Sequence, residues 1–524
     1  MVECQLPKLD VVGSSPIARS IFVLFFFLAF SSLFAQVESD PSRPFDQGQV
    51  LLLPGMTGYI GDLPHSISMF EGIPANHTVS GSLATEVGWL NSAGSSQPGL
   101  RNFIPGIFFE GIAYPFSSTL ILDSMPQAGK VGILDFPASA WWGPSAAAGA
   151  ILIEPSSIIE KTKEGFSIWG SDGGPWGADD LFRNPSLSVE GNYQHGIQAG
   201  FGGTENFDIL TKERWVQTDD AQFESDFLGT QSGSQVNWYA AFADLRLFSP
   251  NFQTLQVKPY FQSAQLGSLS TQDTGGFLNY LLNVAGLVQA HFGAGFDHED
   301  EKMVTGPVQI NKGFVQTTDF FDVLGPLTFD GALRVDFSSV ADTQFSTLLG
   351  LQAVQGAFTF MGDYAKGVLT TPLEDVQQVD LGFSFQPTSE WEVGVKYLHL
   401  TMGGNSLDGA RFELGLDHDS PLLFLIRGTK LQFAEQVLQN PDGSLLYDTS
   451  GKWVFSLLPR TRFTVRGRVL SGQAVFGEVG ADYSATDHIS LFASLANINN
   501  LPVSWPDVTT PTGRVLWAGI QGQF

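Results

Sequence analysis

Apolar and polar side chains alternate along many short segments of the chain after residue 156. In the segment 327–337, for example, Leu333 and Val335 belong to an apolar side, whereas Arg334 and Asp336 belong to a charged side. A period of two is typical of a β-strand with two unlike faces. The same pattern occurs in a predicted hairpin over 379–399 and in the segments Leu255 to Phe261, Phe412 to Leu416, Val475 to Tyr483 and Ile489 to Leu495. The second part of the chain is therefore predicted to consist of strands.

These strands fit a closed membrane barrel better than a soluble sandwich. A sandwich also alternates, with its apolar face inward, but here the segments are numerous and the charged face persists from strand to strand. In lipid, only a closed barrel pairs every backbone group of a sheet, with apolar side chains toward lipid and polar ones toward the lumen. Arg334 and Asp336 are expected to pair there with each other or with groups of a plug inside the barrel. Residues 156–524 are expected to form about 18 to 22 antiparallel strands, each with about 9 to 11 residues in the membrane.

A segment rich in small residues precedes the strands, from Pro137 to Ile153 (PASAWWGPSAAAGAILI). Its Ala, Ser and Gly residues allow backbone segments to approach closely, and it ends on an apolar strand. Taken alone, it predicts a tightly packed turn that leads into a strand, which a secreted β-protein of another kind could also contain.

This segment resembles, almost position by position, the end of the plug domain of TonB-dependent outer-membrane receptors, where a stretch like PASALYGSGAxGGVINI leads into the barrel. Upstream, Thr119 to Pro126 (TLILDSMP) is similar to that family's T-L-V-L-x-D-G-V-P segment, and Leu100-Arg101-Asn102 stands in place of an apolar residue, Arg and Gly. Asp135 and Phe136 depart from the family's Arg and Gly. On this resemblance, the plug motif comprises Asp123, Pro137, Ser139, Gly143 and Gly149.

The end of the chain carries a second resemblance. Thr512 to Phe524 (TGRVLWAGIQGQF) places Leu516, Ile520 and Phe524 on one alternating face, like the strand that signals assembly in outer-membrane barrels. Just before it, Asn497 to Asn500 and Pro511 to Arg514 resemble the N-L-F-N and P-G-R ending of TonB-dependent receptors. The expected fold is an all-β transmembrane barrel with a small N-terminal α/β plug. The expected domains are a signal peptide over 1–35, a flexible leader over 36–53, a plug-like domain over 54–155 and the barrel over 156–524.

The N-terminal residues 20–35 form a continuous apolar run after Lys8 and Arg19, with small residues near a cut after Ala35, as in a secretory signal peptide. Its removal would take away Cys4, the single cysteine, so the mature chain would have neither disulfides nor thiolate metal sites. The net charge of -27 argues against nucleic-acid binding, which needs clustered Lys and Arg. We expect the mature protein to lie in the outer membrane of a Gram-negative-type bacterium.

No HExxH, GxSxG, Walker or CxxC motif occurs, so neither an enzyme nor a cofactor is predicted. The densest ionisable run, Asp297 to Glu301 (DHEDE), could bind a hard cation through oxygen atoms. Such a run is more typical of a solvated loop, and no metal site is predicted. Ligand contacts are predicted at the plug apex, at Arg101, Phe103, Phe108 and Phe109.

The resemblance implies ligand uptake. An unidentified small ligand would bind the extracellular loops and plug apices, and the energised TonB complex would pull on the plug, while lipid and the barrel assembly machinery would be further partners. The family's coupling segment has no good match here, and Val50 to Leu53 is the nearest candidate. Because the plug is also short, a passive porin-like or structural barrel with a vestigial plug stays open as an alternative, as does a secreted all-β binding or enzymatic protein.

Overall fold

The computed structural model describes a large part of the chain between residues 106 and 523. The described residues are 106–109, 112–115, 128–134, 138–147, 149–155, 164–175, 186–200, 206–223, 234–249, 253–266, 269–284, 288–303, 306–322, 327–370, 373–388, 391–402, 404–418, 427–439, 442–470, 475–486, 488–501, 503–505, 508–510 and 514–523. The predicted signal peptide and leader lie outside them, as do Arg101, Phe103, Asp123, Pro137 and Phe524.

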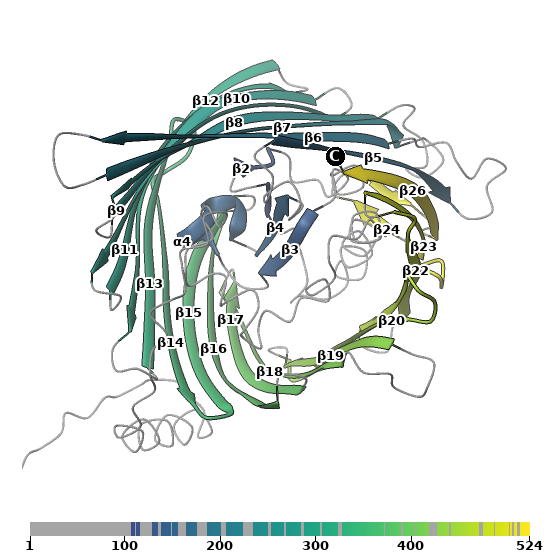
Figure 1. Cartoon of the computed structure of the whole chain (residues 1–524). Helices are drawn as coiled ribbons and strands as arrows, with labels where there is room; N and C mark the ends of the chain where they lie inside the picture. The colour runs from purple at the N-terminus through teal and green to yellow at the C-terminus, as the bar shows by residue number, and fades with distance from the viewer. Residues whose placement is uncertain are drawn as a thin grey trace, which may run out of the picture.

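Twenty strands of the described chain, β5 to β23 and β26, close into one antiparallel barrel (Figure 1). This number falls within the predicted range of about 18 to 22 strands. Their bounds are β5 Glu164–Pro175, β6 Ser186–Gly200, β7 Asn206–Phe223, β8 Ser234–Ser249, β9 Gln253–Leu266, β10 Leu269–Val284, β11 Val288–Met303, β12 Gly306–Asp322, β13 Leu327–Ser338, β14 Gln344–Gln355, β15 Phe358–Thr370, β16 Leu373–Thr388, β17 Trp391–Met402, β18 Asn405–His418, β19 Arg427–Gln439, β20 Leu445–Ser456, β21 Thr461–Leu470, β22 Val475–Ser484, β23 Ile489–Ala496 and β26 Val515–Gln523. A separate two-stranded sheet joins β24 (Val503–Trp505) and β25 (Val508–Thr510).

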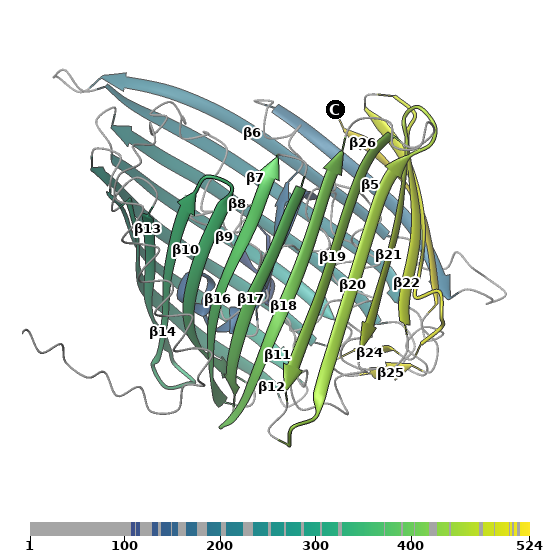
Figure 2. The same cartoon turned by 90° about the horizontal axis from the view of Figure 1, so that it is seen from below.

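Each barrel strand pairs with its neighbours in sequence, and β26 closes the ring on β5, with Trp517 opposite Gly173. We call the end of the barrel where β5 begins and β26 ends the terminal end, and the opposite end the distal end (Figure 2). Because successive strands are antiparallel, every second connection lies at the distal end. Four of these connections contain two residues each, namely 267–268, 304–305, 371–372 and 403–404.

The two faces of the strands differ as the alternation predicts. On β13, Leu333 and Phe337 are 45% and 48% exposed, whereas Arg334 between them is 8% exposed. On β16, Phe383 is 40% exposed and Asp380 is 3% exposed. Apolar side chains therefore cover the outside of the barrel and charged ones line its interior, which is the arrangement that lipid requires.

The charges inside the barrel pair across neighbouring strands. Lys396 of β17 lies 3.4 Å from Asp380 of β16. Arg468 of β21 lies 2.5 Å from Asp448 of β20, and the same strand carries Arg466, which pairs with Glu478 of β22. Buried charges that lack a partner are strongly destabilising, so these pairs explain how a charged face persists along adjacent strands.

The acidic run Asp297 to Glu301 lies within strand β11, so its expected position in a solvated loop is wrong. The alternation of the strand separates its side chains. Glu299 is buried and pairs with Lys312 of β12, whereas His298 and Asp300 contact one another at the more exposed face. The period of two along β11 therefore continues through the charged residues, and pairing with β12 fixes them in the wall.

A small mixed sheet with order β2-β1-β4-β3 lies inside the ring of barrel strands (Figure 1). Its strands are β1 (Gly106–Phe109), β2 (Ile112–Ala113), β3 (Ala128–Leu134) and β4 (Ala150–Pro155), with β1 and β4 parallel. Between β3 and β4 lie the short helices α4 (Ser139–Trp142) and η3 (Pro144–Ala146). The chain changes from this small sheet to the barrel between Pro155 and Glu164. Neither helix, nor any other in the described ranges, is long and apolar enough to cross a membrane.

Candidate functional site

The turn formed by α4 and η3 is built on two glycines. The amide of Gly143 donates to the carbonyl of Ser139 and ends α4, and Gly143 has φ +88° and ψ -176°. Pro144 then starts η3 with a φ that suits a helical first residue. Gly149 has φ +108° and donates to the carbonyl of Ala146 at 3.1 Å. Because residues with a side chain rarely adopt these conformations, the chain needs glycine at both positions.

Small side chains let this turn pack directly onto the barrel wall. One buried apolar cluster joins plug residues to barrel residues: Phe108, Ala138, Ala140, Trp141, Ala146 and Ala150 from the plug, and Ala332, Leu348, Met361 and Ala365 from β13, β14 and β15. A Cβ atom placed on Gly367 of β15 would lie 3.1 Å from the Cβ atom of Ser139. The backbone of the plug therefore packs closely against the backbone of the wall at Ser139 and Gly367, and larger side chains there would push the two apart.

Arg334 of β13 connects the turn to the barrel. Its guanidinium donates to Asp336 at 2.8 Å and to Oε1 of Gln316 at 2.8 Å, and lies 3.8 Å from the centre of the Phe314 ring. Its Nη1 also donates to the carbonyl of Trp141 in α4, at 3.4 Å. The expectation that Arg334 and Asp336 pair with each other or with plug groups is confirmed in both respects. Three barrel side chains thus hold one arginine against the plug.

Gly143 lies directly against this arginine. A Cβ atom on Gly143 would lie 2.8 Å from Nη2 of Arg334, which, like Nε, pairs with Asp336 at 2.8 Å. A side chain at this position would therefore have to displace a buried guanidinium. Backbone conformation and close contact both require glycine here.

A second polar contact ties the other side of the plug to the wall. Nε2 of Gln262, on β9, donates to the carbonyl of Ala113 in β2 at 2.8 Å and to Asp273 of β10 at 2.6 Å. The next plug residue, Tyr114, is buried, and burial raises the pKa of its phenol above the usual value. Its hydroxyl therefore stays protonated inside the barrel.

The structure brings together only part of the predicted site residues. Ser139 and Gly143 lie at the contact between plug and wall, and Gly149 is bonded within the plug, to Ala146 and Gly106. Phe108 is 1% exposed and packs against Trp142 with ring centres 5.2 Å apart. Phe109 belongs to β1, and its proposed ligand contact stays a prediction, as does that of Phe108. Leu516 and Ile520 lie on β26, and Ile520 is exposed on the outer face; their role in assembly also stays a prediction.

Sequence reasoning missed Gln262 and Gly367, because neither belongs to a motif and their contacts with the plug come from residues more than one hundred positions away. In the part of the chain that the structure describes, no group of three or more His, Cys, Asp or Glu residues could hold a metal ion. The inward carboxylates of β10 and β11 instead contact Lys312, Thr271 and Gln262.

No protein-family model and no curated protein matches the sequence. Solved structures do match it. The ferric enterobactin receptor PfeA from Pseudomonas aeruginosa, in a mutant form, has a TM-score of 0.60 and 10% identity over 87% of this chain and 96% of that one. The siderophore receptor PirA from Pseudomonas aeruginosa has a TM-score of 0.54 and 12% identity over 81% and 92%. The FrpB iron transporter from Neisseria meningitidis has a TM-score of 0.53 and 11% identity over 80% and 92%.

Each match extends over at least 92% of the receptor and at least 80% of this chain. The resemblance that the sequence carries in Pro137 to Ile153 thus agrees with the three-dimensional arrangement. The chain has the plugged-barrel fold of TonB-dependent siderophore and iron receptors.

Proposed function

We propose that this protein is an outer-membrane transporter that takes up a small ligand through its barrel when the plug moves. The observation that carries the proposal is the polar contact between the plug and the wall, in which Arg334 holds the carbonyl of Trp141 in α4 and Gln262 holds the carbonyl of Ala113 in β2. The fold it shares with a siderophore receptor, a ferric enterobactin receptor and an iron transporter supports this function rather than an enzymatic one. A ferric chelate is accordingly the first ligand to test.

The polar contacts between plug and wall can break and form again without disrupting the barrel. The hydrogen bonds from Arg334 and Gln262 to the plug backbone are of a kind that contributes on the order of 0.5–3 kcal/mol each. Both donors keep their barrel partners when the plug leaves, since Arg334 remains paired with Asp336 and Gln262 with Asp273. Displacing the plug therefore leaves no stranded charge in the wall, which makes its movement compatible with an intact barrel.

A disulfide between the plug and the wall tests the movement. The Cβ atoms at positions 139 and 367 would lie 3.1 Å apart, close to the roughly 3.5–4.5 Å of a disulfide, so S139C with G367C needs only a small shift. We expect the oxidised double variant to lose uptake of a radiolabelled ferric siderophore and to recover it after reduction. The single variants S139C and G367C are the matched controls. Uptake that continues through a fully cross-linked barrel would contradict the proposal.

A passive pore is the second candidate, and the distal end of the barrel supports it. Four distal connections have two residues each, which leaves little chain for ligand-binding loops over those strands. A protonophore separates the two candidates, because energised uptake stops when the membrane potential collapses and passive flux does not.

Deleting Gln36 to Pro54 then tests coupling through the leader. For the energised transporter we expect uptake to collapse while the amount of barrel at the surface, measured in parallel, is unchanged. Unchanged uptake would favour the passive pore.

A further inference from the structure

Four polar side chains lie together on the outer face of β17 and β18, beside the short connection between these strands at the distal end. His399 and Thr401 belong to β17, and Asp408 and Ser406 are their cross-strand partners on β18. His399 follows Leu398, which is 5% exposed on the inner side, so His399 and Thr401 face outward. Residues directly opposite each other share a face, which places all four side chains outside the barrel.

Three of these side chains form a chain of hydrogen bonds. The carboxylate of Asp408 lies 2.9 Å from Nδ1 of His399, and the hydroxyl of Thr401 lies 3.4 Å from Nε2 of the same ring. Because a carboxylate only accepts, Nδ1 carries the proton and Nε2 accepts one from Thr401. Tyr397 donates its hydroxyl to Asp408 as well and holds the carboxylate in place. Carboxylate, imidazole and hydroxyl in this order are the arrangement of a nucleophilic triad, which is recognised by geometry and not by sequence position.

Two further polar groups flank the hydroxyl of Thr401. Since that hydroxyl donates to His399, it accepts from Ser406, whose oxygen lies 3.1 Å away. On the other side, Gln377 of β16 is the cross-strand neighbour of Thr401. The tetrahedral intermediate of acyl transfer needs hydrogen-bond donors beside the nucleophile to stabilise its oxyanion. The register supplies one hydroxyl and one amide there.

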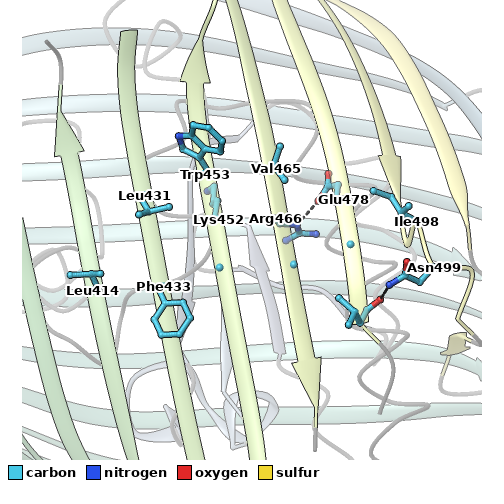
Figure 3. Close-up of a pocket in the computed structure, with 14 residues that line it drawn as sticks. Leu414, Leu431, Phe433, Lys452, Trp453, Val465, Arg466, Glu478, Ile498 and Asn499 are labelled. Carbon is cyan, nitrogen blue, oxygen red and sulfur yellow. Dashed lines mark hydrogen bonds and ion pairs between the residues drawn. The ribbon is translucent and has the colours of Figure 1, made fainter. Parts of the chain in front are cut away.

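The position of the triad on the barrel indicates the substrate. The side chain of Asp408 is 55% exposed on the outer face, and a charge there is tolerated near the membrane interface but not at the centre of the lipid. Further toward the terminal end the outer face is apolar, and a cavity of about 630 Å³ opens there, lined by Leu414, Phe433 and Trp453 among others (Figure 3). A lipid on this face keeps its hydrocarbon chains against the apolar wall and brings its ester groups to the level of the triad.

We propose that Thr401 and His399 hydrolyse an acyl ester of a membrane lipid at the outer face of the barrel. Oγ1 of Thr401 forms a bond to the ester carbonyl carbon while its proton passes to Nε2 of His399. The bond between that carbon and the lipid alcohol then breaks, and the alcohol takes the proton from His399. Water releases the acyl chain from Thr401 as a fatty acid by the same two proton transfers, while Asp408 positions the imidazole. This activity is independent of whether the plug moves.

Fatty acid release by the purified full chain tests the site. The protein is assayed in mixed micelles with phosphatidylethanolamine in one arm and lipopolysaccharide in the other, and hydrolysis of either lipid supports the proposal and identifies the ester. Thr401→Val and His399→Gln should each lower the rate about a hundredfold, whereas Thr401→Ser should keep it within about threefold. Asp408→Asn should lower kcat about tenfold or more with KM unchanged, because it acts through the imidazole.

Thr347→Val is the matched control. Thr347 lies on the outer face of β14, between the buried Ser346 and Leu348, so the same change is made away from His399. Its rate should equal that of the native protein. A long-chain fluorophosphonate should label Thr401 in the native protein and not in His399→Gln, which a purely structural role would not explain.

Each variant is first checked for the heat-modifiable mobility of an assembled barrel, so that a loss of activity is read only from folded protein. Hydrolysis of neither lipid by the native protein, or a native rate in Thr401→Val, would overturn the proposal. So would a native protein that fluorophosphonate does not label, or labelling that persists in His399→Gln.

Discussion

Replacement of Gly143 by alanine tests the plug contact most directly. The native residue has φ +88° and ψ -176°, a region that side chains make unfavourable by about 1–3 kcal/mol. The added Cβ atom would also lie 2.8 Å from Nη2 of Arg334 and would displace it from Asp336. Losing one hydrogen bond between charged groups costs about 1.5–3 kcal/mol. Together these effects predict that plug seating weakens by about 2.5–6 kcal/mol.

The consequence is measurable as an increase in open barrels, because each 1.4 kcal/mol changes an equilibrium about tenfold. The assay is single-barrel conductance in planar bilayers during a urea titration, in which the midpoint of opening reports the free energy of plug displacement. We expect the midpoint of Gly143→Ala to fall well below that of the native protein. The barrel itself should keep its heat-modifiable mobility on gels, since Gly143 lies outside the twenty barrel strands.

A second background separates the two causes. Arg334→Met combined with Asp336→Asn removes both members of the ion pair and leaves no buried charge. In that background Gly143→Ala should cost only the conformational part, about 1–3 kcal/mol. Equal costs in the two backgrounds would show that the guanidinium contact contributes nothing, and an unchanged midpoint in the native background would refute the whole argument.

Two further substitutions test the division between plug and barrel and the orientation of the wall. Gly149→Leu places a branched side chain at φ +108° in a buried turn and should weaken plug seating by about 1–3 kcal/mol in the same titration, and loss of the assembled barrel would contradict the division. Leu333→Arg places a charge on the exposed face of β13 and should destabilise the barrel folded in vesicles by about 2–4 kcal/mol. The control Val340→Arg, in the turn after β13, should cost about 0–1 kcal/mol. Equal costs would place Leu333 outside the lipid belt.

The sequence alone determined which face of each strand meets lipid. The alternation around Leu333 and Arg334 is a local property of the strand, because successive side chains point to opposite sides whatever the neighbouring strands are. The small-residue turn is likewise predicted from local sequence, and the structure adds that Gly143 and Gly149 have a positive φ. The error at Asp297 to Glu301 has a local cause too, because a run of charges predicts a loop although the period of two continues through it in β11.

Only the tertiary structure decided which residues meet across the barrel. Gln262 lies on β9, Arg334 on β13 and Gly367 on β15, and nothing in their neighbouring residues indicates contact with Ala113, Trp141 or Ser139. The register of β20, β21 and β22 likewise aligns Gly451, Gly467 and Gly477. None of the three belongs to a sequence motif, but together they line one cavity. Alternation fixes the face of a residue, but the pairing of strands and the closure of the ring fix its neighbours, and those depend on the whole chain.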